Sequence, residues 1–100
     1  MSENRHTIVF GTVTMTTGDT EYSLAIPKDA RELAMKLEDA TKAWRLSATT
    51  GVVAAGGYRL VAGESASFVE GLKEQTLYFA CTTAGQTLHY SYLVPYRTRP

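Results

Sequence analysis

Residues 76–93, TLYFACTTAGQTLHYSYL, constrain the fold most, because larger hydrophobic side chains alternate with smaller or more polar ones in two runs. An alternation of period two places successive side chains on opposite faces of an extended strand. Between the runs, Gly85 can adopt the positive φ that a short hairpin loop requires. The stretch therefore predicts a β-hairpin. Most of its core is expected to come from Leu77, Phe79, Cys81, Leu88 and Tyr90.

Residues 6–26 predict a second hairpin at the start of the domain. The run HTIVFGTVTMTT is rich in β-branched residues, and TEYSLAI follows after the turn signal at residues 17–19. Gly11 interrupts the first strand and indicates a bulge or the close approach of another backbone. One face of that strand carries Ile8, Phe10, Thr12 and Thr14, and the other carries Val9, Val13 and Met15.

The middle of the chain fits two interpretations. Good helix formers dominate residues 29–42, which favours a helix. Leu33, Met35 and Leu37 nevertheless alternate with polar or small residues, which favours a strand. Because the neighbouring segments are strands that need partners, we predict strands here and keep the helix as the alternative. The predicted strands are residues 32–38 and 42–48, paired through a turn at residues 38–41.

Further short strands are predicted at residues 58–62 and 65–70, on either side of a turn at Gly63 and Glu64. The glycine-rich residues 48–57 form either a loop or a short edge strand at residues 52–54. About eight short segments separated by regular turn signals are typical of an all-β protein, an antiparallel β-sandwich or jelly-roll-like domain. The expected organisation is an N-terminal tail (residues 1–5), a single β domain (residues 6–94) and a C-terminal arm (residues 95–100).

The charge balance limits the partners of this chain. Ten Lys plus Arg residues and ten Asp plus Glu residues give a formal net charge of zero. Nucleic-acid binding draws its affinity from an excess of Lys and Arg facing phosphates, so no nucleic-acid partner is expected. No segment approaches the roughly 20 apolar residues of a membrane span, so no membrane partner is expected either. The polar N-terminus, MSENRHT, is not followed by an apolar segment like that of a signal peptide.

The sequence offers no constellation of catalytic side chains. Cys81 is the only cysteine, and it is interpreted as a small buried hydrophobic residue rather than a reactive thiol. His89 is interpreted as a solvent-facing strand residue, and together with Cys81 it supplies too few ligands for zinc. The glycines show no strand–loop–helix context for phosphates. We therefore expect a non-enzymatic protein with no catalytic residues, cofactor-binding residues or metal ligands.

Two segments, GYRLVAGESASFVEGL and LYFACTTAGQTL, resemble small virion proteins of tailed bacteriophages. The pattern is a tyrosine, a glycine–serine turn, a glycine–leucine step, a Leu-Tyr strand and an Ala-Gly hairpin, and the similarity covers residues 18–93. The resemblance implies a capsid-decoration or cement protein, made in the host bacterial cytoplasm and found in the virion. Its partners would be the major capsid protein or another virion protein, and copies of itself.

A second hypothesis is a carbohydrate- or receptor-binding module of a tail fibre or spike. Such a module binds its ligand through exposed aromatic side chains, and at least half of the available ones are expected to pack in the core. The available aromatic residues are Trp44, Tyr58, Tyr78, Tyr90, Tyr92 and Tyr96.

The C-terminal arm is the predicted partner-binding segment, through Tyr96, Arg97 and Arg99. Arg side chains pair with carboxylates, and tyrosine is common in interfaces. Deletion of residues 95–100 is expected to leave the melting curve of the isolated domain unchanged and to weaken oligomer or capsid binding. Differential scanning fluorimetry and a binding assay measure the two effects. Unchanged affinity after the deletion would show that the arm is only a tail.

Overall fold

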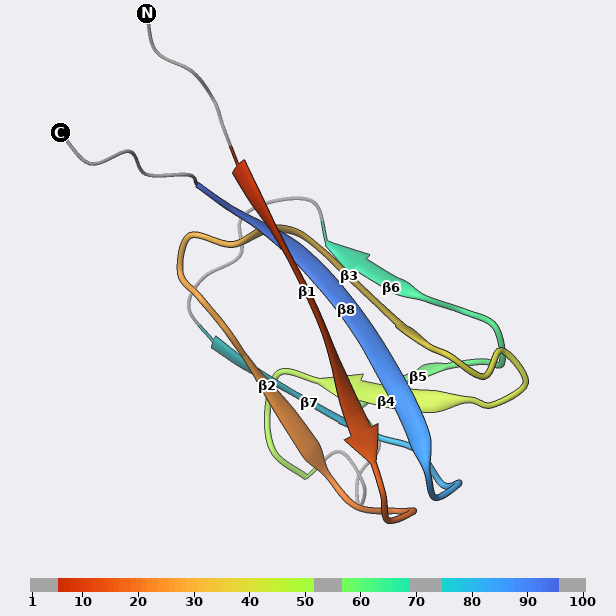
Figure 1. Cartoon of the computed structure of the whole chain (residues 1–100). Coiled ribbons are helices and arrows are strands. Elements are labelled where there is room, and N and C mark those ends of the chain that lie inside the picture. The colour runs from red at the N-terminus through yellow and green to blue at the C-terminus, as the bar shows by residue number, and fades with distance from the viewer. Residues whose placement is uncertain (1–5, 52–56, 69–74, 96–100) are drawn as a thin grey trace, which may run out of the picture.

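The structure is a computed structural model that describes residues 6–51, 57–68 and 75–95. Within these ranges the chain forms eight strands in two antiparallel sheets and no helix. The strands are β1 (His6–Met15), β2 (Tyr22–Ile26), β3 (Arg31–Leu37), β4 (Trp44–Ser47), β5 (Tyr58–Leu60), β6 (Ala66–Phe68), β7 (Gln75–Ala80) and β8 (Gln86–Pro95). Figure 1 shows β1 and β8 side by side along the length of the molecule.

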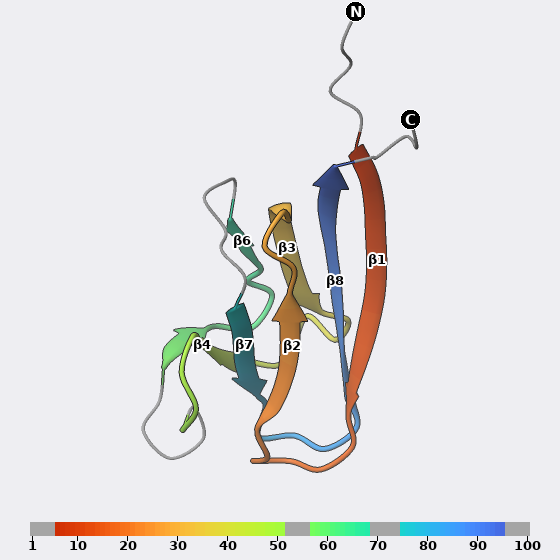
Figure 2. The same ribbon diagram turned by 90° about the vertical axis from the view of Figure 1, so that its left-hand side faces the viewer.

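The strand order identifies the sandwich as a jelly roll. One sheet has the order β1-β8-β3-β6 and the other β2-β7-β4-β5, and Figure 2 shows them as two layers. Apart from the step from β4 to β5, each connection in this series crosses from one sheet to the other. This interleaving is the double-sheet arrangement of jelly rolls. The predicted all-β sandwich is therefore confirmed.

The strand interpretation of the middle of the chain is also confirmed. Residues 31–37 form strand β3 rather than part of a helix. The side chains of Leu33, Met35 and Leu37 are buried, and those of Ala34 and Lys36 between them are exposed. Helix propensity is a weak preference, and here the burial of one strand face in the sandwich overrides it.

The predicted hairpins are wrong, because the paired runs belong to different sheets. Strand β7 pairs with β2 and β4, whereas β8 pairs with β1 and β3. The same holds for β1 and β2 and for β3 and β4. Alternation reveals that a strand has one apolar face, but both members of a hairpin and facing strands of a sandwich satisfy that pattern. The loops at residues 16–21, 38–43 and 81–85 are therefore arches between the sheets.

Two of these arches support each other at one end of the molecule. The backbone N–H of Asp19 donates to the carbonyl of Cys81 at 2.9 Å, and that of Gly85 donates to the carbonyl of Met15 at 2.8 Å. Gly85 has a φ of 79°, as the sequence predicted for the loop that follows β7. Gly18 lies against the carbonyl of Thr82, where a Cβ would collide with it. The arches at residues 16–21 and 81–85 therefore stabilise each other.

The core lies between the sheets and contains the residues predicted for it. Leu77, Phe79, Cys81 and Leu88 are buried, and Tyr90 packs against them. Trp44 is also buried, and its Nε1 donates to the carbonyl of Glu64 at 3.3 Å. The remaining buried hydrophobic residues are Met15, Ile26, Ala30, Leu33, Met35, Leu37, Leu46, Leu60 and Ala80.

Gly11 marks neither of the two features predicted from its position. The β1–β8 ladder runs from His6↔Pro95 to Met15↔Gln86 without a register shift, so there is no bulge. Gly11 faces Tyr90 across the ladder, and the phenol ring of Tyr90 occupies the place of a Cβ at residue 11. The close approach is that of a side chain rather than a backbone. Tyr90 in turn stacks on Tyr92, with ring centroids 6.1 Å apart.

Several predicted segments fall on residues that the structure does not describe. Residues 1–5 and 96–100 lie outside the described residues, as does the predicted short strand at residues 52–54. The predicted strands around Gly63 are present as β5 and β6, and residues 69 and 70 of the second prediction again lie outside the described part.

Replacing Phe79 with alanine tests the core. Its side chain is fully buried, so Phe79→Ala is expected to lower the free energy of unfolding by about 3–5 kcal/mol. Phe10→Ala is the matched control, because 75% of Phe10 is exposed and little burial is lost. Urea unfolding of both variants measures the difference. Similar losses in the two variants would show that the inward face has been misassigned.

The arch between β3 and β4 gives a pH prediction. Hydrogen bonds from the Thr41 hydroxyl (2.6 Å) and from its backbone N–H (2.9 Å), followed by the charge of Lys42, hold the pKa of Asp39 below its ordinary value. Because the folded pKa lies below the unfolded one, this stabilisation is complete above the unfolded pKa of about 3.9 and disappears as the pH falls through the folded pKa.

Removing the hydroxyl tests this coupling. Thr41→Val is expected to raise the pKa of Asp39 in the folded protein and to weaken the loss of stability in acid. An NMR titration of the Asp39 carboxyl measures the pKa directly. Thr7→Val, at an exposed threonine of β1, is the control and should leave the titration of Asp39 unchanged.

Candidate interaction surface

The outer face of the β1-β8-β3-β6 sheet carries the most exposed large hydrophobic side chain among the described residues. Met15 is buried and Val13 packs against the core, so the alternate residues of β1 point outward. These include Phe10, which is 75% exposed, and Ile8, which is 55% exposed. Two neighbouring large hydrophobic side chains on one exposed strand face are a feature of interaction surfaces.

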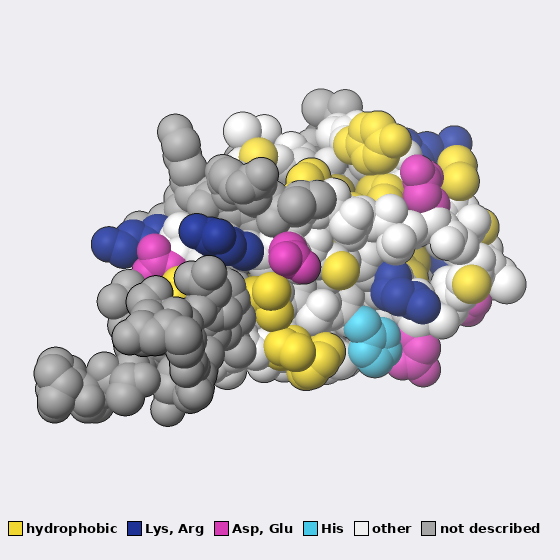
Figure 3. Space-filling view, turned by 90° about the horizontal axis from the view of Figure 1, so that it is seen from above, with side chains coloured by type: hydrophobic (Ala, Val, Ile, Leu, Met, Phe, Trp, Pro, Cys, Tyr) yellow, Lys and Arg dark blue, Asp and Glu magenta, His cyan; other side chains and the backbone are white. Residues whose placement is uncertain are grey.

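Across the sheet, Phe10 begins a row that also contains Ser91 of β8 and Ala34 of β3. The next row contains Thr12, His89 and Lys36. Figure 3 shows hydrophobic side chains along this side of the molecule, next to a histidine with basic and acidic neighbours. The surface between the rows forms a shallow hollow of about 210 Å³, lined among others by Phe10, Lys36 and His89.

His89 is a solvent-facing strand residue, as the sequence predicted. Its side chain is 45% exposed, and Nε2 lies 2.8 Å from Oε1 of Glu38. Because both side chains are largely in water, this contact contributes little to stability. Lys36 lies opposite His89 in the register of β3 and β8. The hollow therefore combines an open aromatic ring with the polar side chains of Lys36, His89 and Ser91.

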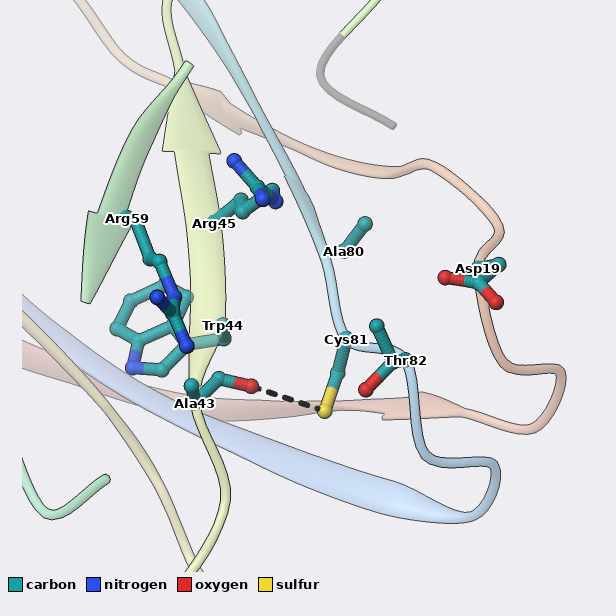
Figure 4. A pocket seen from close by; sticks show the side chains of 8 residues that line it. All are labelled: Asp19, Ala43, Trp44, Arg45, Arg59, Ala80, Cys81 and Thr82. Atoms are coloured by element: carbon teal, nitrogen blue, oxygen red, sulfur yellow. Dashed lines mark hydrogen bonds between the residues drawn. The ribbon is translucent and has the colours of Figure 1, made fainter. Parts of the chain in front are cut away.

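A second hollow, of about 140 Å³, lies beside Cys81 on the other sheet. Figure 4 shows its lining, with Arg45 and Arg59 on neighbouring strands and Asp19 on the opposite side. The two arginines are cross-strand partners, but their guanidinium groups lie apart in the figure and do not converge on one point. Cys81 is buried, and its thiol donates to the carbonyl of Ala43 at 3.3 Å. Its interpretation as a buried hydrophobic residue is confirmed.

The largest of these three hollows, about 580 Å³, opens between β5 and β6 at the side of the sandwich. Its walls are mainly apolar and include Leu46, Leu60 and Leu77, with Tyr58 and Phe68 more exposed. Residues 52–56 and 69–74, which belong to connections of these strands, lie outside the described residues. The lining offers an apolar surface and no cluster of catalytic groups.

The predicted partner-binding residues are not part of the described surface. Tyr96, Arg97 and Arg99 lie outside the described residues. Trp44, one of the aromatic residues considered for carbohydrate binding, is buried in the core and is not available to a ligand. Burial, with a smaller contribution from Tyr90, raises the pKa of Tyr92. The open aromatic side chain of the outer face is instead Phe10, which the sequence had placed on a strand face without indicating its exposure.

Neither a metal site nor a membrane-spanning helix is found among residues 6–51, 57–68 and 75–95. No group of three or more His, Cys, Asp or Glu side chains in these ranges is placed to hold a metal ion. No helix in the same part of the chain is long and apolar enough to cross a membrane.

Comparison with known proteins gives few matches. No protein-family model matches the chain, and a search of curated proteins finds no match either. Among solved structures, the chain is similar to a protein of Bacillus endospore appendages, which are described as a novel family of disulfide-linked pili. The two are 19% identical with a TM-score of 0.47, and the alignment covers 97% of this chain and 96% of that one.

Proposed function

We propose that this protein is a non-enzymatic structural subunit that binds and stabilises a larger protein particle through the outer face of its β1-β8-β3-β6 sheet. The observation that carries the proposal is the exposure of Phe10 and Ile8 on a regular strand that pairs with β8 along its whole length. Burying these side chains against a partner removes apolar surface from water, which stabilises the contact. A rigid sheet also loses little conformational freedom on binding.

The particle in this proposal is a bacteriophage capsid, which the protein decorates from outside. The resemblance of GYRLVAGESASFVEGL and LYFACTTAGQTL to virion proteins supports this assignment. In the structure these segments contain β5, β6, most of β7, the arch at residues 81–85 and the start of β8. The partners are then the major capsid protein and copies of this chain, and the protein is located in the virion.

A carbohydrate- or receptor-binding module is the second candidate. The burial of Trp44 removes one of the aromatic residues considered for this function. The hollow beside Phe10 restores part of the argument, because His89, Lys36 and Ser91 place polar groups next to an open ring. A glycan array probed with the wild type and Phe10→Ala distinguishes this candidate, since glycan binding that depends on Phe10 would favour it over particle binding.

Replacing Phe10 with aspartate tests the structural function. The change places a charge at the centre of the proposed contact, so particle binding is expected to weaken on the order of thirtyfold or more. The melting temperature should stay within a few degrees of the wild type, because the position is exposed. Co-sedimentation with purified capsids, and with isolated capsid protein, measures the binding.

Val61→Asp is the matched control, because Val61 is 56% exposed and lies beyond β5, outside this face. It should bind like the wild type. Absence of binding by the wild type to both capsids and capsid protein would contradict capsid decoration. Equal weakening by the two substitutions would contradict the assignment of the contact to this face.

A further inference from the structure

We infer that the free edge of β1 pairs with β1 of a second copy of this chain, joining two four-stranded sheets into one antiparallel sheet. The inference rests on the proposed structural function, since it names a partner for the same sheet. It concerns the backbone edge of β1, whereas the proposed capsid contact concerns the outer face.

Strand β1 ends its sheet and has β8 as its only partner among the described strands. Figure 2 shows no described segment on the far side of β1. The direction of its free backbone groups follows from the neighbouring hydrogen bonds. The carbonyl of Thr87 accepts from the N–H of Glu38 at 2.9 Å, so the backbone of Thr87 faces β3. Its ladder partner, Thr14, therefore directs its own N–H and C=O away from β8.

The same direction recurs at every second residue, because the ladder has no register shift. Ile8, Phe10, Thr12 and Thr14 thus present their N–H and C=O groups at the open edge. The carbonyl of Met15 accepts from Gly85, which agrees with odd-numbered residues facing β8. The edge is therefore a regular row of four donors and four acceptors.

This edge lacks the features that normally prevent strands from pairing. Residues 7–15, TIVFGTVTM, contain no charged residue and no proline. The ladder has no bulge to twist the edge away. Protein edges are usually protected by lysine, proline, bulges or short length. With ten residues, β1 is long as well as unprotected, which makes it a template for an added strand.

The length and charge of the edge select a second copy as the partner. The other strands at sheet edges are β2 with five residues and β5 and β6 with three each. Of these four edges, only β1 of a second copy is long enough to pair with β1 along all of its ten residues. An uncharged strand is also not repelled by a second copy of itself. A two-fold axis through Gly11 centres the pairing on the uncharged run. Phe10 then lies opposite Thr12 of the second copy, an aromatic and β-branched pair that suits neighbouring strands.

Analytical ultracentrifugation of the wild type and of Thr12→Pro tests the inference. The wild type is expected to sediment as a dimer of twice 10.9 kDa, and the dimer should be lost in Thr12→Pro, leaving 10.9 kDa. Proline removes the outward N–H of residue 12 but no hydrogen bond to β8, so the fold should persist. Thr12→Val is the matched control, because it keeps the N–H and the branched side chain, and it should remain dimeric.

Amide hydrogen exchange provides a measurement that does not depend on the proline variant folding. The amides of Phe10, Thr12 and Thr14 should exchange slowly in the dimer and fast after dilution to the monomer. Those of Gly11 and Val13 bond to β8 and should stay protected in both states. Thr14→Lys keeps every N–H but charges the edge, and it should raise the dissociation constant on the order of tenfold.

Three results would overturn the inference: a wild type that stays monomeric at the highest concentration tested, a Thr12→Pro variant that still dimerises, or assemblies that keep growing beyond two copies. The last would mean that β1 pairs with a different edge of the next copy. Particle binding by a monomer would refute the edge pairing and leave the proposed function intact. A dimer that binds no particle would refute the proposed function and leave the edge pairing intact.

Discussion

The pairing of the first strand with the last is the interaction on which the remaining structure depends. Strand β8 lies between β1 and β3, and its ladder with β1 contains ten residue pairs. Without β8, the sheet would retain only the contact of β3 with the three-residue strand β6. The same ladder places the arches after β1 and before β8 side by side, where their backbones bond to each other. Because it joins the two ends of the described chain, its loop-closure entropy is large, and folding must wait for almost the whole sequence.

This dependence on distant strands explains which parts of the fold the sequence could predict. Period-two alternation identified strands and their inward faces correctly at β3, β7 and β8, because burial acts on each strand separately. Pairing is different, because residues 81–85 are long enough for a hairpin loop and also for a crossing between sheets about 10 Å apart. The contact between the arches at residues 16–21 and 81–85 decides between these two pairings. No local sequence pattern encodes the contact between Asp19 and Cys81.

The sequence pattern also could not predict which single side chains of the candidate surface are exposed. Both faces of β1 carry hydrophobic residues, so alternation alone could not tell whether Phe10 or Met15 is buried. The structure buries Met15 and leaves Phe10 open. On the inward face, Gly11 leaves a gap that Tyr90 fills from the other end of the chain. Trp44 is the opposite case, because it was considered as an exposed aromatic residue and is buried. Its burial depends on Leu60, its register partner, and on the carbonyl of Glu64.

The uncharged residues on the outward face of β1 are not required by the sandwich. Thr12 and Thr14 are exposed, and their backbone groups face away from β8, so lysine or glutamate there would cost the core nothing. Charges are present elsewhere on the same sheet, at Lys36 and Glu32 of β3, so the fold tolerates them on exposed strand positions. A neutral edge also loses the repulsion that keeps strands of separate molecules apart. The sandwich therefore does not determine the identity of the outward residues of β1, whereas it does require the inward residues Val13 and Met15.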